Sequence, residues 1–193
     1  MKRLILAIAF VLGWASAAWA AAPAQLTTLH AIHSLSRDEV GKNLPVAFEA
    51  TVTYLRQGKT SLFVQDGNEG LLVKTNTNLK LAPGDHILIE GKAQFSFRPI
   101  VIAENITVLD HVTLPKPVPA TFDELNRSER DCLRVTVRAV VRTTDVRFNS
   151  GRPATQIHLL IDGGTLDVWV DGDDPIPFQE LIDATVEVIG VAS

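Results

Sequence analysis

An internal repeat of strand patterns most restricts the folds open to this chain. Residues 46–54 alternate apolar and polar side chains, which predicts a half-buried β-strand. The same alternation returns 89 residues later, at residues 135–141, and in the same phase. A sequence that repeats one structural unit is expected to fold as two similar modules.

Three further strand patterns recur in the same order. The copies of the first end in Asp66-Gly67 and Asp162-Gly163, a residue pair that favours a tight hairpin turn. The offset grows from 89 to 96 and then 99 residues, as expected for loop insertions. The three patterns cover residues 62–67, 71–74 and 87–91 in the first copy, and residues 158–163, 166–169 and 186–190 in the second.

A fifth strand is predicted only in the first copy. It covers residues 100–109, with Asn105 as a bulge or turn residue. The second copy reaches Gly190 and the sequence stops at Ser193. We therefore expect the second module to lack its last strand, to have open edges, and to belong to a fragment of a longer protein.

Helix starts and a proline-rich spacer mark the limits of the modules. Residues 36–39 and 121–124 both fit the capping box, in which a hydroxyl and a carboxylate bond the first free amides of a helix. Residues 177–182 favour a short helix before the last strand of the second copy. Prolines in residues 113–120 predict an extended linker that cannot join a ladder, because proline has no amide donor.

The order of these elements is that of the OB-fold, a small Greek-key barrel. We predict an all-β protein with short helices, made of two tandem OB-fold-like five-stranded barrels. The first covers residues 44–112, after a lead-in with a short helix at residues 21–43, and the second, incomplete barrel covers residues 121–193.

The amino-acid sequence of the repeat also resembles that of a known group of proteins. The segments that carry the resemblance are Leu44-Pro45-Val46, Leu62-Phe63-Val64-Gln65-Asp66-Gly67, Pro83-Gly84-Asp85, Ile89-Glu90-Gly91, Arg98-Pro99-Ile100-Val101 and Val186-Glu187-Val188-Ile189-Gly190-Val191. They resemble the extracytoplasmic amino-terminal regions of bacterial membrane signalling proteins, such as sensor histidine kinases and GGDEF-type diguanylate cyclases. The resemblance implies a module that precedes a transmembrane helix and a cytoplasmic output domain, neither of which this sequence contains.

The first twenty residues have the order of a secretory signal peptide. Lys2 and Arg3 precede an apolar run that ends in the small-residue site Ala18-Trp19-Ala20. We expect cleavage there and a periplasmic or other extracytoplasmic location; an uncleaved signal anchor is the alternative, because the apolar run is nearly long enough to span a bilayer.

The net charge and the single cysteine limit the kinds of partner and of covalent bond that we expect. Without residues 1–20 the chain has 16 basic and 22 acidic residues, a net charge of −6, which disfavours nucleic acid. Cys132 is the single cysteine, so no internal disulfide can form. Its Leu/Val-rich surroundings predict a buried thiol, with a reactive thiol or an intermolecular bridge as the alternative.

No catalytic or metal-binding pattern is present in the sequence. His30 and His33 lack a nearby third ligand, and Asp171-Gly172-Asp173-Asp174 lacks the glycine and glutamate positions of a calcium loop. Signatures of serine hydrolases, phosphate loops and dinucleotide sites are missing too. We predict that the protein is not an enzyme and needs neither a metal nor a cofactor.

OB-folds bind ligands on strands 2 and 3 and on adjoining loops. Aromatic and basic side chains at these positions suit stacking and anion contacts, although Tyr54 and Phe63 could instead fill the barrel, and Trp169 could be core or platform. Arg98 stands out because neither loop nor barrel requires a guanidinium there. The candidates are Tyr54, Arg56, Phe63, Gln65, Lys74, Phe97 and Arg98 in the first copy, and Arg142, His158 and Trp169 in the second.

These features favour a non-catalytic extracytoplasmic module that senses a small molecule or contacts a partner protein domain. One alternative is a periplasmic binder of single-stranded nucleic acid or oligosaccharide. Another is a structural module of an envelope assembly, which would pair an edge strand with its partner. Contact with a membrane is expected only through a missing carboxy-terminal region or the uncleaved anchor.

Overall fold

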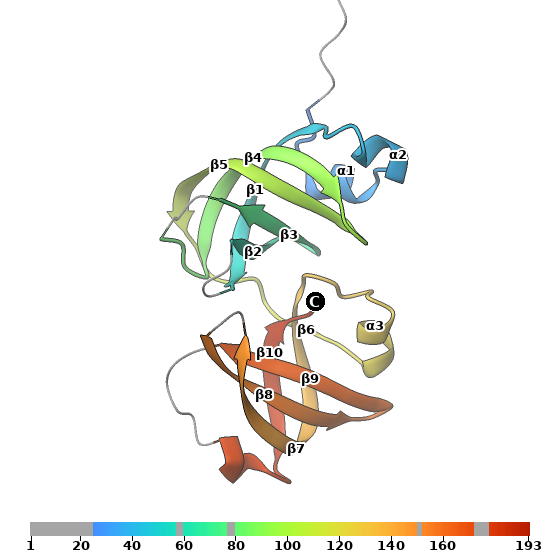
Figure 1. Cartoon of the computed structure of the whole chain (residues 1–193), viewed down its shortest axis with the longest axis vertical. Coiled ribbons are helices and arrows are strands. Elements are labelled where there is room, and N and C mark those ends of the chain that lie inside the picture. The colour runs from blue at the N-terminus through green and yellow to red at the C-terminus, as the bar shows by residue number, and fades with distance from the viewer. Residues whose placement is uncertain (1–24, 57–59, 77–79, 150–151, 172–177) are drawn as a thin grey trace, which may run out of the picture.

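Two β-modules follow one another along the chain and lie one above the other in Figure 1. The computed structural model describes residues 25–56, 60–76, 80–149, 152–171 and 178–193. The predicted signal peptide lies outside these residues. Among the residues described, no helix is long and apolar enough to cross a membrane.

The first module is a closed five-stranded barrel. Neighbouring strands follow the order β1-β2-β3-β5-β4, with β5 parallel to β3 and antiparallel to β4. This is the predicted OB-fold topology, which the structure confirms. The strands are β1 (Pro45–Leu55), β2 (Ser61–Asp66), β3 (Glu69–Thr75), β4 (Asp85–Phe95) and β5 (Pro99–His111).

Alternating apolar residues build the core of this barrel. Val46, Phe48, Ala50 and Val52 of β1 all point inward and are buried, as the period-2 pattern predicts. The register of β5 against β4 shifts between residues 103 and 105, so a bulge lies beside Asn105, as expected from the sequence.

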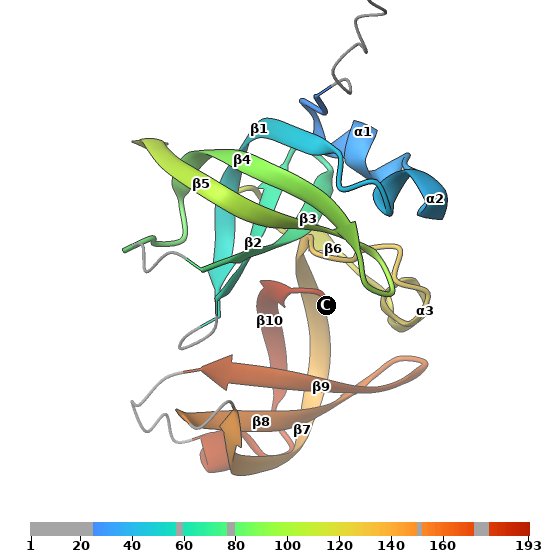
Figure 2. The ribbon, with the colours of Figure 1, turned by 45° about the horizontal axis from the view of Figure 1, so that its top comes forward.

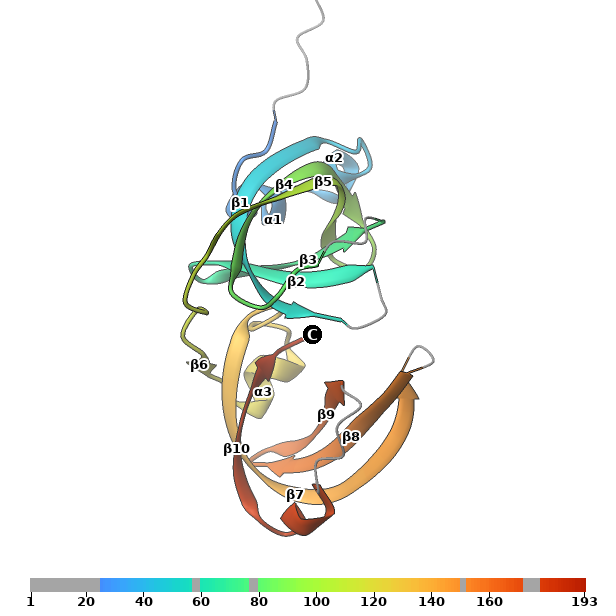
Figure 3. The same cartoon turned by 90° about the vertical axis from the view of Figure 1, so that its left-hand side faces the viewer.

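The second module is an open half-barrel. Its strands follow the order β10-β7-β8-β9, and within the described residues no strand pairs with the free edges of β9 and β10 (Figure 3). The prediction of a second OB-like unit without its last strand is therefore confirmed for the described part of the chain. Its strands are β7 (Arg134–Asn149), β8 (Arg152–Ile161), β9 (Gly164–Asp171) and β10 (Thr185–Val191).

The two modules share a bulge, and the bulge fixes their equivalence. In β1 the register shifts around Thr53, so that Tyr54 lies opposite Phe63. In β7 it shifts at the equivalent residue, and Thr143 lies opposite His158. His158 is thus the counterpart of Phe63, and the expected offset of 96 residues for this strand is wrong by one residue.

The hairpin turns explain that error. Gly67 is the first residue of a two-residue turn between Asp66 and Glu69, whereas Gly163 is the second residue of the turn that ends at Gly164. Aligning the two Asp-Gly pairs therefore shifts one strand against the other. Both glycines have positive φ angles, 56° and 97°, which glycine adopts without strain.

Short helices cover one end of each barrel. α1 (Leu29–His33) and α2 (Arg37–Val40) lie together beside the first barrel in Figure 2, and α3 (Phe122–Asn126) precedes the second. Both predicted capping boxes are present, at α2 and α3. However, α1 packs on β3 as α3 packs on β9, so α3 is the structural counterpart of α1, although its cap resembles that of α2.

Two predicted connectors also take defined forms. A 3-10 helix, η1 (Phe178–Leu181), stands before β10, where a short helix is expected. The end of the proline-rich linker forms β6 (Val118–Pro119), parallel to β7, so the expectation that this segment stays out of a ladder is wrong there. The amide of Ala120 donates to Thr136, and Pro119 needs no donor at this edge.

Candidate functional site

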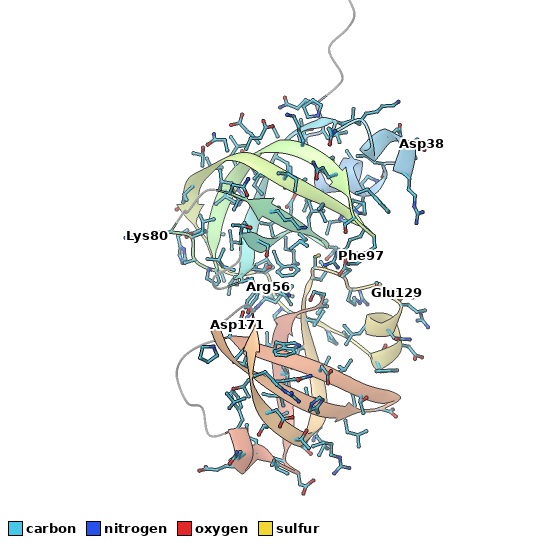
Figure 4. All side chains as sticks on the ribbon, in the orientation of Figure 1. Asp38, Arg56, Lys80, Phe97, Glu129 and Asp171 are labelled. Atoms are coloured by element: carbon cyan, nitrogen blue, oxygen red, sulfur yellow. The ribbon has the colours of Figure 1, made fainter. Side chains whose placement is uncertain are left out.

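The second module docks on the outer face of β1 and β2 in the first. The hydroxyl of Tyr54 donates to a carboxylate oxygen of Asp171, 117 residues away in the sequence. The side-chain oxygen of Gln65 accepts from the backbone amide of Arg134 at 3.0 Å. In Figure 4, Arg56 and Asp171 lie where the two modules meet. The usual ligand face of the first OB-fold is thus partly occupied by its neighbour.

The loop between α3 and β7 comes closest to the first barrel at Cys132. A Cβ atom on Gly70 would lie 2.3 Å from the carbonyl oxygen of Cys132, so this contact requires glycine. Cys132 itself is buried, as predicted, and has a φ of 60°. Burial raises the pKa of its thiol to about 12, and a thiol with this pKa is protonated at neutral pH.

A cavity of about 910 Å³ lies between the modules and extends into the open half-barrel. Its floor is apolar and comprises Leu166, Val168 and Val188, which pack on the core of the second module. Two residues of α3, Phe122 and Leu125, line the same space. Because β9 and β10 form its sides, the cavity occupies the position where a closed barrel would have a fifth strand.

The first module supplies the roof of this inter-barrel cavity. The guanidinium of Arg56 lies 5.9 Å from the centre of the Phe63 ring, and the Tyr54 and Phe63 ring centres are 6.1 Å apart. Burial, together with the hydrogen bond to Asp171, raises the pKa of Tyr54 well above its ordinary value of 10.0. The roof therefore offers the Arg56 cation and the Tyr54 ring above an apolar floor, whereas Phe63 is only 2% exposed and presents little surface.

Four predicted ligand residues meet at this cavity: Tyr54, Arg56, Phe63 and Trp169 all line it. Trp169 is 44% exposed and faces away from the barrel core, because its neighbours Val168 and Val170 point inward. Trp169 is therefore not a core residue of the second module.

The other candidates lie elsewhere. Gln65 is buried between the modules and Lys74 is exposed on β3. Arg142 pairs with Asp183 at 3.0 Å, and His158 lies 2.5 Å from Asp167 on the outer face of β8 and β9. The structure does not bring these four side chains together into one site.

Arg98 and Phe97 lie at a second, smaller hollow. The guanidinium of Arg98 pairs with Asp131 of the second module and lies 5.2 Å from the ring centre of Phe97, which is 79% exposed. The expectation that nothing requires a guanidinium here is wrong, because Arg98 joins the two modules. Among the described residues, this hollow of about 350 Å³ is lined by the carboxylates of Glu69, Glu129 and Asp131 and by the guanidinium of Arg98.

Metal-binding residues do not converge in the part of the chain that the structure describes. His30 lies 2.8 Å from Glu69, and His33 lies 3.0 Å from the carbonyl oxygen of Gly70, so the two histidines have different partners. No group of three or more His, Cys, Asp or Glu side chains among the described residues could hold a metal ion. Residues 172–174 of the predicted acidic turn lie outside this part.

Sequence reasoning missed Asp131 and Asp171 as partners between the modules. Neither belongs to a motif, and the sequence gives no sign of which faces of the two barrels meet. The strand alternation that selects Trp169 does place Asp171 on the same face of β9.

Comparisons with known proteins assign no family to this chain. No protein-family model matches the sequence, and no curated protein does. Similar solved structures include the hypothetical protein YgiW from E. coli, with 15% identity, a TM-score of 0.36, and coverage of 44% of this chain and 89% of that one.

Two further solved structures overlap more of the chain. The p204 HINb domain has 15% identity and a TM-score of 0.37, over 65% of this chain and 75% of that one. A replication protein A heterotrimer bound to single-stranded DNA has 17% identity and a TM-score of 0.34, over 72% of this chain and 40% of that one. Because these superpositions are loose, the OB-fold assignment rests on the strand order of this chain.

Proposed function

We propose that this chain is a non-catalytic, extracytoplasmic binding module and that the inter-barrel cavity is its binding site. The carrying observation is the cavity itself, which brings four candidate residues from both modules around one space. Its volume of about 910 Å³ is within the range of sites that take small molecules or side chains of a partner. The resemblance to extracytoplasmic regions of signalling proteins supports a role in sensing.

The chemistry at the cavity supports binding over catalysis. The phenol of Tyr54 has a raised pKa, so it is a hydrogen-bond donor and not a base at neutral pH. The buried thiol of Cys132, which lines the smaller hollow at Arg98 and not this cavity, also stays protonated and is a poor nucleophile. Binding by aromatic contact and charge needs neither group to change its protonation state.

The charge around the cavity argues against the nucleic-acid alternative. Arg56 and Arg130 line it, but so do the carboxylates of Asp131, Asp167 and Asp171. A groove for a single strand needs an excess of positive charge along its length. We expect no change in anisotropy when a labelled single strand is added at low salt.

Binding in the cavity can be tested with 8-anilinonaphthalene-1-sulfonate, an apolar ring system with one negative charge. We expect its fluorescence to rise on binding and Trp169 emission to fall through energy transfer. Val188→Glu places a charge on the apolar floor and should abolish the signal. Val146→Glu is the matched control, because Val146 is 76% exposed on β7 and is not among the residues that line the cavity.

A substitution in the first module, which forms the roof of the cavity, gives a second test that does not alter the apolar floor. Arg56→Ala removes the cation beside Phe63 and should weaken binding of the sulfonate while leaving the melting temperature unchanged. Near-UV circular dichroism would verify that each variant keeps its tertiary packing, since loosened cores also bind this dye. Equal binding by the wild type, Val188→Glu and Arg56→Ala would refute the cavity as the site.

A further inference from the structure

Two equivalent glycines have different surroundings in the two modules. Gly91 of β4 lies opposite Val46 of β1, and Gly190 of β10 lies opposite Val135 of β7 at the repeat-related position. A Cβ atom on Gly91 would lie 2.1 Å from the carbonyl oxygen of Ile102 in β5. A Cβ atom on Gly190 would have nothing within 4 Å.

The surroundings of Gly91 therefore explain why this position holds glycine, whereas nothing in the described residues explains the glycine at position 190. At Gly91 the backbone of β5 crosses so closely that a side chain cannot fit. A glycine within a strand weakens it, because it loses more backbone freedom and packs no side chain. Gly190 keeps this disadvantage, which is explained if a backbone crosses there as β5 crosses Gly91.

Burial of the core points to the same missing element. In the first barrel Leu71 and Val73 of β3 and Ile87 and Ile89 of β4, the two strands that flank β5, are at most 1% exposed. Their counterparts in the second module are only partly buried. These counterparts are Leu166, Val168, Val186 and Val188. The side chains of one further strand would therefore bury the apolar surface that these four residues leave exposed.

The free edges of β9 and β10 add hydrogen-bonding groups. In the first barrel the edges of β3 and β4 pair with β5, whereas in the second module the edges of β9 and β10 have no strand partner among the described residues. Edge amides and carbonyls that face a shared slot favour an extended backbone over a small molecule. The glycine at residue 190 also leaves room for a closely passing backbone, which a small molecule does not need.

We propose that the inter-barrel cavity receives one extended strand of a separate partner protein, which closes the second barrel. The inference rests on the proposed function, since it names the occupant of the same cavity. The strand runs parallel to β9 and antiparallel to β10, as β5 runs against β3 and β4. Its backbone passes Gly190.

The register of β5 gives the residue pattern of this strand. Val101 lies opposite Val73 and Ala93, which correspond to Val168 and Ala192 in the second module. Two residues further, Ala103 lies opposite Gly91, so a small side chain is expected opposite Gly190. After the bulge comes a larger apolar residue, equivalent to Ile106 and opposite Val188. The pattern is apolar, any, small, any, any, apolar.

A labelled peptide of residues 99–111, the β5 sequence, is a direct probe because it carries this pattern. We expect the purified chain to bind it, with a rise in fluorescence anisotropy, and the sulfonate dye to compete. Gly190→Val should weaken binding by about tenfold or more, because its side chain occupies the path of the backbone. The free Gly190→Val chain should melt no lower than the wild type, since nothing lies near this position.

A peptide with Val101→Asp and Ile106→Asp is the matched control and should not bind. Absence of peptide binding, while the dye still binds, would overturn the strand proposal and leave the proposed function standing. Equal binding by wild type and Gly190→Val would show that the peptide sits elsewhere and would also overturn it. A dimer of the free chain that Gly190→Val dissociates would identify a second copy as the occupant and overturn the commitment to a separate strand.

Discussion

Replacement of Gly91 by alanine is the sharpest test of how the first barrel closes. The added Cβ would lie 2.1 Å from the carbonyl oxygen of Ile102 and 2.9 Å from the Cα atom of Ala103. Both contacts are with backbone atoms, which cannot move aside by a change of rotamer. The β4–β5 ladder must therefore separate by more than 1 Å at its bulge to reach ordinary contact, about 3.4 Å or more for such atoms.

The cost follows from two effects. Overpacking of a well-packed site costs about 1–3 kcal/mol. Each ladder hydrogen bond that the separation breaks costs roughly 1 kcal/mol more. Part of this cost, about 0.4–1 kcal/mol, is offset because alanine leaves the unfolded chain less conformational freedom than glycine does. The net destabilisation of Gly91→Ala is therefore about 2–3 kcal/mol, or a fall of roughly 10–20 °C in the melting temperature of a barrel this size.

Gly190→Ala is the matched control, because the same substitution there meets open space. It should leave the melting temperature unchanged or raise it by a few degrees. Differential scanning calorimetry of the two variants gives the comparison. In the chain without residues 1–20, Trp169 is the only tryptophan, so its fluorescence separates the melting of the second module. A Gly91→Ala chain that melts within about 3 °C of wild type would refute the crossing of β5 over this glycine.

Three further predictions address single groups. Tyr54 is the only tyrosine, so absorbance at 295 nm should show its phenol ionising above its ordinary pKa of 10.0 in the folded chain and near it in denaturant. Because the folded pKa is raised, the resulting stability is complete below pH 10 and is lost as pH rises beyond it; coincident titrations would contradict this. Cys132 should react slowly with a thiol reagent at pH 8, and Gly70→Ala should speed the reaction by about tenfold by displacing the loop; equal rates would exclude the close contact. Thr121→Ala should lower stability by about 1 kcal/mol through loss of the α3 cap, and an unchanged urea midpoint would contradict that role.

The strand pattern of this fold was predictable from the sequence because burial on one face forces a period of two residues. The alternation at residues 46–54 gave β1 within one residue at each end, and the repeat then supplied β7. The same comparison predicted the missing fifth strand. Turn chemistry misled only where two Asp-Gly pairs occupy different positions of their turns.

The way in which the two modules dock could not be predicted from the sequence. Arg98 pairs with Asp131 across 33 residues, and Tyr54 pairs with Asp171 across 117. Periodicity tells which side of a strand a residue occupies, but not which module covers that side. The fold therefore directed attention to Tyr54 and Phe63, while their surroundings became apparent only from the assembled pair.

The roof and floor of the inter-barrel cavity belong to different modules. Any molecule that fills it contacts both, so its binding free energy depends on how the barrels are held relative to each other. By the reciprocity of linkage, occupancy must also favour one relative arrangement of the barrels over others. A ligand of this cavity would therefore couple its own binding to the placement of one module relative to the other.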